Sequence, residues 1–334
     1  MTSHDPLASV VLLTYNGERY LGEVLDSVFK QKTSFQYEVI VIDSGSTDTT
    51  LEIVRSHPVN LHQIPNSEFN HGETRNLGAR LARGRFVAYL TQGATPADEH
   101  WLQHLVDAFD LNPKVAAVYG LHIPRPDCDP VTKRDLEEFF KMMGPRDQAT
   151  VQYIRDGDEA WKEYQRNEGI IGFYSDVNSC LRKTVWEEIP YQALDYAEDQ
   201  AFGRDILKAG YGKVYEPRAA VIHSHSYPFL GYFRRQFDEY RGLRRSIGFA
   251  QTGGLAKVFL GALKGGLVDS RYIWREKYSL AANLKWTHHA YTMNFLRRLA
   301  GYLAAKEDRL PPWLVGTISL EARARENAAR GEQG

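Results

Sequence analysis

The sequence predicts an α/β fold: a mostly parallel β-sheet covered by helices on both faces, with a helical extension at the C-terminal end. Short runs rich in Val and Ile alternate with segments whose apolar residues recur at helical spacing, as in βαβ units. After Pro228 the pattern turns helical and basic. The 334 residues, 43% hydrophobic, suffice for two domains. We expect them to cover residues 1–235 and 236–334.

The expected elements alternate along the first domain. Each strand is a short apolar run that ends in a turn signal, and each helix has apolar residues on one face. The expected strands cover residues 10–13, 38–43, 85–90 and 115–119. The expected helices cover residues 21–29, 51–54, 72–83 and 101–109, with Gly84 as the C-terminal cap of the third. Residues 125–165 are polar and poorly periodic, so they predict a long excursion with some helix. Regular structure is expected again at 172–173 and 178–181.

The first three of these strands end in polar loops. The loops begin at Thr14, Asp43 and Thr91, and they should converge, because ligands of parallel sheets bind at the carboxyl ends of the strands. Asp43 and the small Ser44 could hold a nucleotide, since a carboxylate accepts from a pyrimidine N–H or a ribose hydroxyl. The alternative is an ordinary capped turn. No G-x-G-x-x-G or P-loop motif is present, which disfavours a dinucleotide site and excludes a P-loop.

Two further stretches carry candidate chemistry. Arg75 lies in the first turns of an expected helix, where its fork and the helix N-terminus favour a diphosphate; the alternative is a surface Arg in a capping segment. Glu198 and Asp199 begin another helix, and His223 and His225 follow the next strand. A site that deprotonates a hydroxyl beside a charged leaving group needs such residues. An acidic pair at a helix start is also common for electrostatic reasons alone.

Taken together, six motifs in order resemble the family 2 glycosyltransferases with the GT-A fold, most of all their rhamnosyltransferase-like branch. They are residues 10–17 (VVLLTYNG), 41–48 (VIDSGSTD), 69–76 (FNHGETRN), 90–92 (LTQ), 197–200 (AEDQ) and 223–226 (HSHS). The resemblance covers about residues 8–235. It implies a Rossmann-like sheet and an inverting transfer of a sugar, with rhamnose as one candidate, from a nucleotide diphosphate sugar to a hydroxyl.

The resemblance also implies roles for individual residues. Asp199 would be the general base, and Glu198 would orient it or touch the acceptor. The expected nucleotide-sugar site consists of Thr14, Tyr15, Asn16, Glu18, Asp43, Ser44, Arg75, Asn76 and Gln92. His225, and less strongly His223, would reach a metal ion or the diphosphate.

Gly93 departs from the family pattern. An aspartate normally follows the Leu90-Thr91-Gln92 strand end and binds Mg²⁺ or Mn²⁺, whereas glycine offers only its carbonyl oxygen. Three interpretations stay open. The diphosphate, water and His225 hold the ion weakly; Arg75 and other cations replace it; or the protein is a weakened variant. The first is favoured, and Mg²⁺ or Mn²⁺ is therefore expected with reservation.

Charge is distributed unevenly along the chain. Residues 1–240 carry a net charge of −10 and residues 241–334 a net charge of +9, with cations interleaved among aromatics in residues 241–298. This pattern suits single-stranded nucleic acid or an anionic membrane surface. The resemblance implies the membrane, because many acceptors in that branch are lipid-linked glycans, so we expect a peripheral contact with an anionic membrane and no membrane span. The alternative is a helical appendage with solvated charges. Two cysteines and no signal stretch predict a cytoplasmic protein, peripheral on the inner face of the cell membrane.

The sequence therefore predicts a glycosyltransferase of surface polysaccharide synthesis. Its expected partners are a dTDP- or UDP-linked sugar and a glycan or lipid-linked acceptor. Two other classes stay open. One is a nucleotide-sugar or glycan-binding protein with weakened catalysis, which Gly93 favours. The other is a nucleotidyltransferase, for which residues 15–19 match poorly the Gly-rich basic loop that such an enzyme needs.

Overall fold

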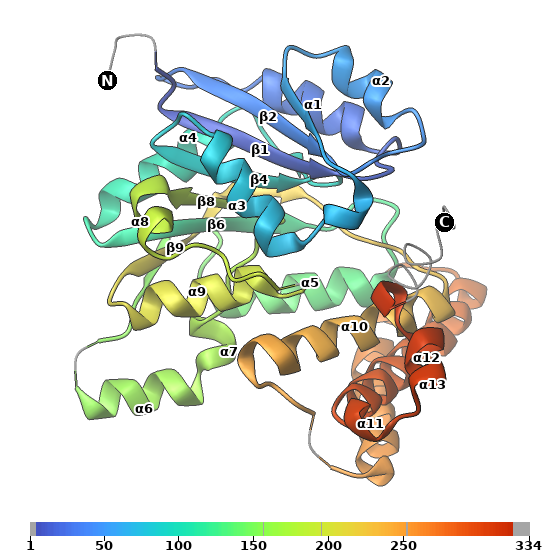
Figure 1. Cartoon of the computed structure of the whole chain (residues 1–334). Coiled ribbons are helices and arrows are strands. Elements are labelled where there is room, and N and C mark those ends of the chain that lie inside the picture. Colours follow the sequence, from blue (N-terminus) through green and yellow to red (C-terminus); the bar gives the residue numbers. More distant parts are fainter. Residues whose placement is uncertain (1–4, 156, 195, 252, 323–334) are drawn as a thin grey trace. The chain divides into compact units, whose positions relative to one another are not determined.

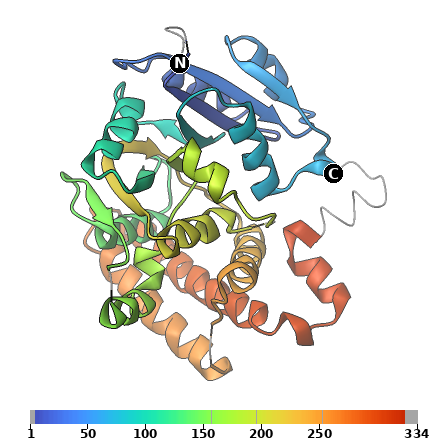
Figure 2. The same cartoon turned by 60° about the vertical axis from the view of Figure 1, so that its left-hand side comes forward.

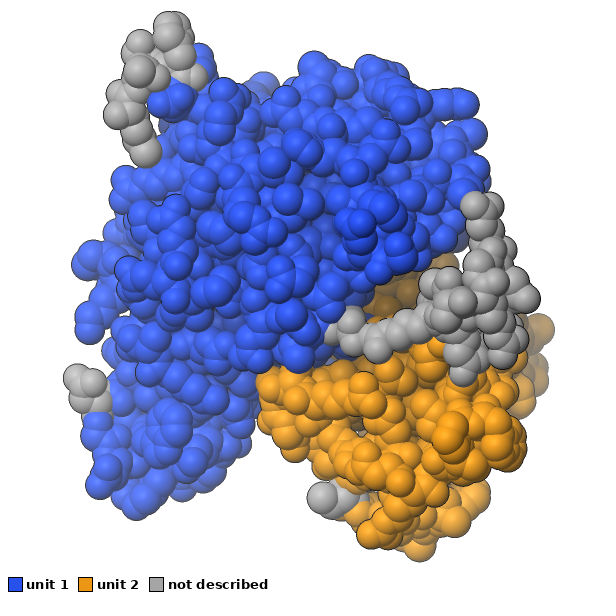
Figure 3. All heavy atoms as spheres, in the orientation of Figure 1, with its two compact units in different colours: residues 1–125, 136–224 blue, residues 126–135, 225–334 orange. Residues whose placement is uncertain are grey.

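The structure is a computed structural model that describes residues 5–155, 157–194, 196–251 and 253–322. The chain forms two compact units (Figures 1 and 3). The first contains residues 1–125 and 136–224, and the second contains residues 126–135 and 225–334. Residue 235, the expected domain boundary, lies within helix α10 (Phe229–Ile247).

A mixed β-sheet forms the centre of the first unit. Its strands are β1 (Ala8–Thr14), β2 (Tyr37–Asp43), β3 (Asn60–Gln63), β4 (Phe86–Thr91), β5 (Thr95–Pro96), β6 (Val115–Ile123), β7 (Thr150–Gln152), β8 (Asn178–Arg182) and β9 (Gly212–Ile222). They are ordered β3-β2-β1-β4-β8-β6-β9-β5, and β7 pairs with β9. The run β3-β2-β1-β4 and the β6-β9 pair are parallel, as expected, whereas β8, β5 and β7 pair antiparallel.

Helices cover both faces of this sheet (Figures 1 and 2). They are α1 (Leu21–Phe29), α2 (Thr50–Arg55), α3 (His71–Leu81), α4 (Trp101–Asp107), α7 (Glu168–Ile171), α8 (Lys183–Glu188) and α9 (Glu198–Lys208). Helix α6 (Asp158–Arg166) contacts α7, and α5 (Pro130–Met143) begins in the second unit and ends in the first. Alternate residues of β1 enter opposite cores, because a strand points successive side chains to opposite faces. Val10 and Leu12 pack with α1 and α4, and Val11 packs with α3 and α9.

Two local expectations need correction. Gly84 does not cap α3: the helix ends at Leu81, and Ala82 follows in an extended conformation. Gly84 instead permits close backbone packing, since a Cβ there would lie 2.6 Å from the carbonyl carbon of Ala8. Residues 125–165 contain more regular structure than expected, namely the helices α5 and α6 and the strand β7.

The second unit is helical. Besides α10, it contains α11 (Leu255–Ile273), α12 (Leu280–Ala304) and α13 (Pro312–Ile318). Glycine allows α11 and α12 to approach closely: a Cβ at Gly266 would lie 2.3 Å from the ring of Tyr291. Within the described ranges, none of the helices combines the length and hydropathy that crossing a membrane requires.

Candidate functional site

The loops after β1 and β2 are joined into one structure by their own polar groups. The Asn16 amide oxygen accepts from the Thr47 N–H at 2.9 Å, and the Asn16 N–H donates to the Ser46 hydroxyl at 2.9 Å. The Glu18 carboxylate accepts from the N–H and hydroxyl of Thr49 at 3.2 and 2.9 Å. Asn16 and Glu18 therefore hold the second loop against the first, which shapes the rim of the predicted nucleotide site.

Asp43 is fully buried at the end of β2 and organises the turn that follows. Its carboxylate accepts from the Gly45 and Ser46 N–H groups, both at 3.0 Å, and from the Ser46 hydroxyl at 2.5 Å. Gly45 has a φ of 84°, a conformation that glycine adopts without strain. Most acceptor capacity of Asp43 is thus used within its own loop, so a direct contact with a nucleotide stays a prediction.

Three buried hydroxyl groups mark the carboxyl ends of adjacent strands. The Oγ1 atoms of Thr14 and Thr91 and the Oγ of Ser44 have no hydrogen-bond partner in the part of the chain that the structure describes. Thr14 pairs in register with Asp43, and Leu13 pairs with Thr91, so these groups lie at one edge of the sheet. Because buried polar groups normally have partners, this edge is where a ligand or ordered water would supply them.

Gln92 connects the ends of β4 and β1. Its amide oxygen accepts from the Tyr15 N–H at 2.8 Å, and its amide nitrogen donates to the Tyr15 carbonyl at 3.0 Å. A Cβ at Gly17 would lie 2.5 Å from the Gln92 amide oxygen, so glycine makes room for this contact. Gln92 therefore positions Tyr15, a residue that stays 40% exposed at the rim.

The acidic dyad belongs to a larger buried cluster. The Arg75 guanidinium forms ion pairs with Asp176, at 2.7 Å between Nε and Oδ2, and with Glu198. Asp199 is half-buried, and its carboxylate accepts from the N–H groups of Gln200 at 2.8 Å and Asp176 at 3.1 Å. Ala197, just before α9, has a left-handed φ of 58°, an uncommon conformation for a residue other than glycine. The chain therefore holds Asp199 in a defined orientation.

This cluster lies at the same edge of the sheet as the unpartnered hydroxyls. The Thr91 N–H donates to the carbonyl of Val177 at 3.3 Å, next to Asp176 in the chain. Leu90 of β4 also pairs in register with Asn178 of β8. The segment whose Asp176 N–H binds Asp199 therefore runs beside the carboxyl end of β4.

The cluster contains fewer positively charged groups than carboxyl groups. Burial, and then the charge of Glu198, raise the pKa of Asp199 to about 7, while Arg75 opposes the shift. Burial also raises the pKa of Glu198, and it raises the pKa of Asp176 to about 6. One guanidinium faces three carboxyl groups, so the cluster retains a proton near neutral pH. A carboxylate with a pKa near the working pH suits general base catalysis.

Arg75 and Asn76 do not resemble a diphosphate clamp. The side chain of Arg75 is committed to Asp176 and Glu198. The Asn76 amide donates to the Tyr191 carbonyl at 2.9 Å and accepts from the N–H groups of Trp186 and Tyr191. Both side chains are buried, and these contacts favour a structural role. Their predicted contact with the diphosphate has no support in this geometry.

The surroundings of Gly93 do not fit a metal ion. Its carbonyl oxygen, the only oxygen that glycine offers, already accepts from Arg125 Nη2 at 3.1 Å and lies 3.0 Å from Nδ1 of His223. Arg125 also pairs with Glu23 at 3.3 Å and stacks on the ring of Tyr20. Among the described residues, no three His, Cys, Asp or Glu side chains gather as a metal site. His225 belongs to the second unit, so its predicted metal contact stays a prediction.

The sequence interpretation missed four residues around these groups. Asp176 belongs to the acidic cluster, Arg125 binds the Gly93 carbonyl, and Tyr20 and Glu23 contact Arg125, yet none of the four lies in a motif of the expected site. Asp176 gave a weak signal as an acidic residue just before an expected strand. The contacts of Arg125 depend on β6 and β9 being neighbours, which the sequence did not reveal.

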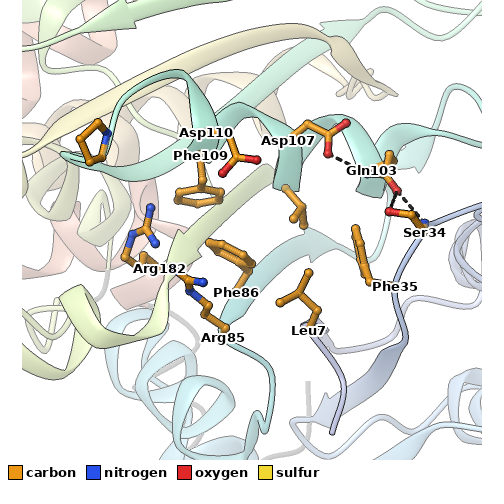
Figure 4. A pocket seen from close by; sticks show the side chains of 12 residues that line it. Leu7, Ser34, Phe35, Arg85, Phe86, Gln103, Asp107, Phe109, Asp110 and Arg182 are labelled. Atoms are coloured by element: carbon orange, nitrogen blue, oxygen red, sulfur yellow. Dashed lines mark hydrogen bonds between the residues drawn. The ribbon is translucent and has the colours of Figure 1, made fainter. Parts of the chain in front are cut away.

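A separate surface hollow of about 590 Å³ lies away from this site (Figure 4). Leu7, Arg85 and Phe86 line it at the amino-terminal ends of β1 and β4, together with Arg182. Ligands of such sheets bind at the opposite, carboxyl edge. The hollow is therefore no candidate for the site.

Comparison with known proteins identifies similar chains. Residues 9–167 match the family described as glycosyl transferase family 2. The chain is 32% identical over 238 residues to the O-antigen chain rhamnosyltransferase RfbN of Salmonella typhimurium, covering 69% of this chain and 70% of the relative. It is 30% identical to the O-antigen chain rhamnosyltransferase WbaN of Salmonella anatum, covering 70% and 71%.

Among solved structures, the fold resembles that of a mannosyltransferase from Pyrobaculum calidifontis in complex with GDP-Man and Mn²⁺. The TM-score is 0.58 at 19% identity, covering 92% of this chain and 89% of the other. The glucosyl-3-phosphoglycerate synthase of Mycobacterium tuberculosis gives a TM-score of 0.51 at 15% identity, covering 74% and 82%. At these identities the likeness concerns the fold alone, and it is the fold that the sequence predicted.

Proposed function

Because the chain belongs to glycosyl transferase family 2 and has the GT-A fold, we propose that it is an inverting enzyme in which Asp199 is the general base. The chain is a glycosyltransferase, as the sequence predicted. The observation that carries the proposal is the environment of Asp199. This half-buried carboxyl has a pKa of about 7, and it lies beside the sheet edge that holds the unpartnered hydroxyls of Thr14, Ser44 and Thr91.

The proposed reaction is a single displacement. The Asp199 carboxylate takes the proton of the acceptor hydroxyl as the oxygen attacks the anomeric carbon. The new C–O bond forms opposite the bond to the diphosphate, which breaks, and the nucleoside diphosphate leaves with the electron pair. The configuration at the anomeric carbon of the sugar is inverted, and the proton remains on Asp199. Arg75 and Glu198 position this carboxylate rather than contact the donor.

The donor and acceptor are finer parts of the proposal. The curated relatives named above are O-antigen chain rhamnosyltransferases, so we propose a dTDP- or UDP-linked sugar, with rhamnose as the first candidate. The acceptor is a hydroxyl of a glycan or a lipid-linked glycan in surface polysaccharide synthesis at the inner face of the cell membrane. Gly93 offers no side-chain ligand, so Mg²⁺ or Mn²⁺ would be carried by the diphosphate of the donor.

A thermal-shift and turnover screen tests the function. Candidate nucleotide sugars, with and without Mn²⁺, should raise the melting temperature of the wild-type protein when they bind the folded state. Asp199→Asn should keep this shift and lose transfer by at least about 100-fold, the typical contribution of a general base. The matched control is Asp205→Asn on the same helix, whose carboxylate contacts Gln192.

Different outcomes identify the competing functions. Binding of a nucleotide sugar by the wild-type protein without turnover on any acceptor would indicate a binding protein. Release of pyrophosphate from a nucleoside triphosphate would indicate a nucleotidyltransferase. Full activity of Asp199→Asn would refute the assignment of the base.

A further inference from the structure

Helix α11 presents an apolar face that the described residues of the second unit leave largely exposed. Five large side chains on this helix are between 45% (Leu267) and 68% (Leu260) exposed. They are Leu255, Phe259, Leu260, Leu263 and Leu267. Four of them are spaced every four residues and therefore form one stripe along the helix. Single exposed apolar residues are common, but a contiguous stripe marks an interaction surface.

The opposite side of α11 is committed to the rest of the unit. Val258, Ala262 and Gly266 are buried, and Gly266 lies against the ring of Tyr291 on α12. The acidic residue of α11, Asp269, is also buried: it accepts from Arg134 and Asn294, both at 2.5 Å. The exposed side of α11 therefore has no negative charge of its own.

A row of cations borders the apolar stripe. Lys257, Lys264 and Arg271 are spaced seven residues apart, so they lie above one another on the helix surface. All three are exposed, and none forms an ion pair with another described residue. An apolar stripe edged by unpaired Lys and Arg is the arrangement of helices that lie in the plane of a membrane interface.

We propose that α11 docks the enzyme on an anionic lipid bilayer, with Leu260 and Leu263 in the acyl boundary and Lys257, Lys264 and Arg271 at the headgroups. The positive charge of the α11 face favours a lipid bilayer over a second copy of the chain as the partner. Two such faces would bring their cations together without an acidic residue of α11 to offset them. The inference rests on the proposed function only in that a lipid-linked acceptor would be met at this surface.

Sedimentation of the full-length protein with vesicles tests the docking. Vesicles of phosphatidylcholine with phosphatidylserine should bind the protein, more weakly as salt rises, and phosphatidylcholine alone should bind it far less. Replacing Lys257, Lys264 and Arg271 with Gln should lower the partition coefficient roughly 100-fold, since each cation contributes about 1 kcal/mol near an anionic surface. Leu260→Gln with Leu263→Gln should abolish binding.

The control replaces exposed residues of the first unit, Leu111→Gln with Lys208→Gln, and should bind as the wild type does. Equal binding to both kinds of vesicle, or unchanged binding of the α11 variants, would overturn the proposal. A dimer in solution that Leu260→Gln with Leu263→Gln converts to monomer would also overturn it. The melting temperature of each variant verifies that it is folded.

In the α11 variants, the donor-induced thermal shift and the transfer to a water-soluble acceptor should match those of the wild type. A failure of docking can therefore be distinguished from a failure of the proposed function.

Discussion

Arg75 and Glu198 form a buried ion pair that joins the second turn of α3 to the first turn of α9. The same guanidinium holds Asp176, and the Asp176 N–H binds the carboxylate of Asp199. One buried cation thus connects two supporting acids to the proposed base. The consequences concern stability as well as catalysis.

Removal of this cation should strongly destabilise the fold. Arg75→Met leaves the carboxyls of Asp176 and Glu198 buried without their cation, a loss that typically costs about 3–5 kcal/mol. Urea unfolding at pH 8 should show this loss. It should be smaller near pH 5, where burial-raised pKa values let these carboxyls take up protons. Arg80→Met, an exposed position on the same helix, should cost under about 0.5 kcal/mol; an equal loss in both variants would contradict the ion-pair explanation.

The pH dependence of transfer should report the cluster. Activity should rise with pH through about 7 as the carboxyl of Asp199 loses its proton. The variant Asp176→Asn has one carboxylate fewer beside Arg75. The guanidinium therefore stabilises the ionised form of Asp199 more strongly. The acid limb of the kcat/KM profile should therefore move to lower pH. An unmoved limb with uniformly reduced rates would mean that Asp176 acts only through folding.

The stability of Asp199→Asn should depend on pH with a defined sign. The pKa of Asp199 is about 7 in the folded protein and about 4 in an unfolded chain. The folded state thus binds the proton more tightly, and the free energy of unfolding of the wild type falls as pH rises through this window. Asn carries no charge, so the variant should gain stability relative to the wild type between pH 4 and 7. Melting curves at several pH values measure this gain, and a constant difference would contradict the raised pKa.

Gly93→Asp should raise activity and tighten its dependence on Mn²⁺. The position has room: a Cβ there would lie 3.8 Å from the rings of His223 and Tyr20. The new carboxylate adds a hard oxygen ligand of the type that divalent cations prefer. Titration of donor binding against Mn²⁺ should show tighter binding, whereas Gly93→Asn, similar in size but uncharged, should show little change. Equal or lower activity than wild type at all Mn²⁺ concentrations would contradict this expectation.

Much of the first unit could be predicted because its signals are local. Val10, Val11 and Leu12 form a buried strand, and the turn after Asp43 needs only residues close in sequence. The strand β3 escaped prediction because its side chains are mostly exposed and its pattern is weakly apolar. The antiparallel pairing of β8 with β4 and β6 also escaped, since hydrophobic runs do not specify the direction of a partner strand.

The candidate site divides in the same way. Asp199 could be found from the sequence because an acidic pair at a helix start is visible in the motif order. The contacts of Arg75 could not, since Asp176 and Glu198 are distant in sequence and meet its guanidinium only in the folded protein. The engagement of the Gly93 carbonyl by Arg125 and His223 likewise depends on how β5, β6 and β9 assemble.

The sequence by itself determined the family, the alternation of strands and helices, and the residue types at the ends of β1, β2 and β4. The family follows from the six motifs and their order, while the elements and their ends follow from periodicity and short-range turn chemistry, which neighbouring residues specify. Only the tertiary structure decided that Arg75 serves the acidic cluster, that Asp199 has a pKa near neutrality, and that the Gly93 carbonyl is already engaged. Burial and long-range ion pairing set these properties, and both exist only once distant segments have packed together.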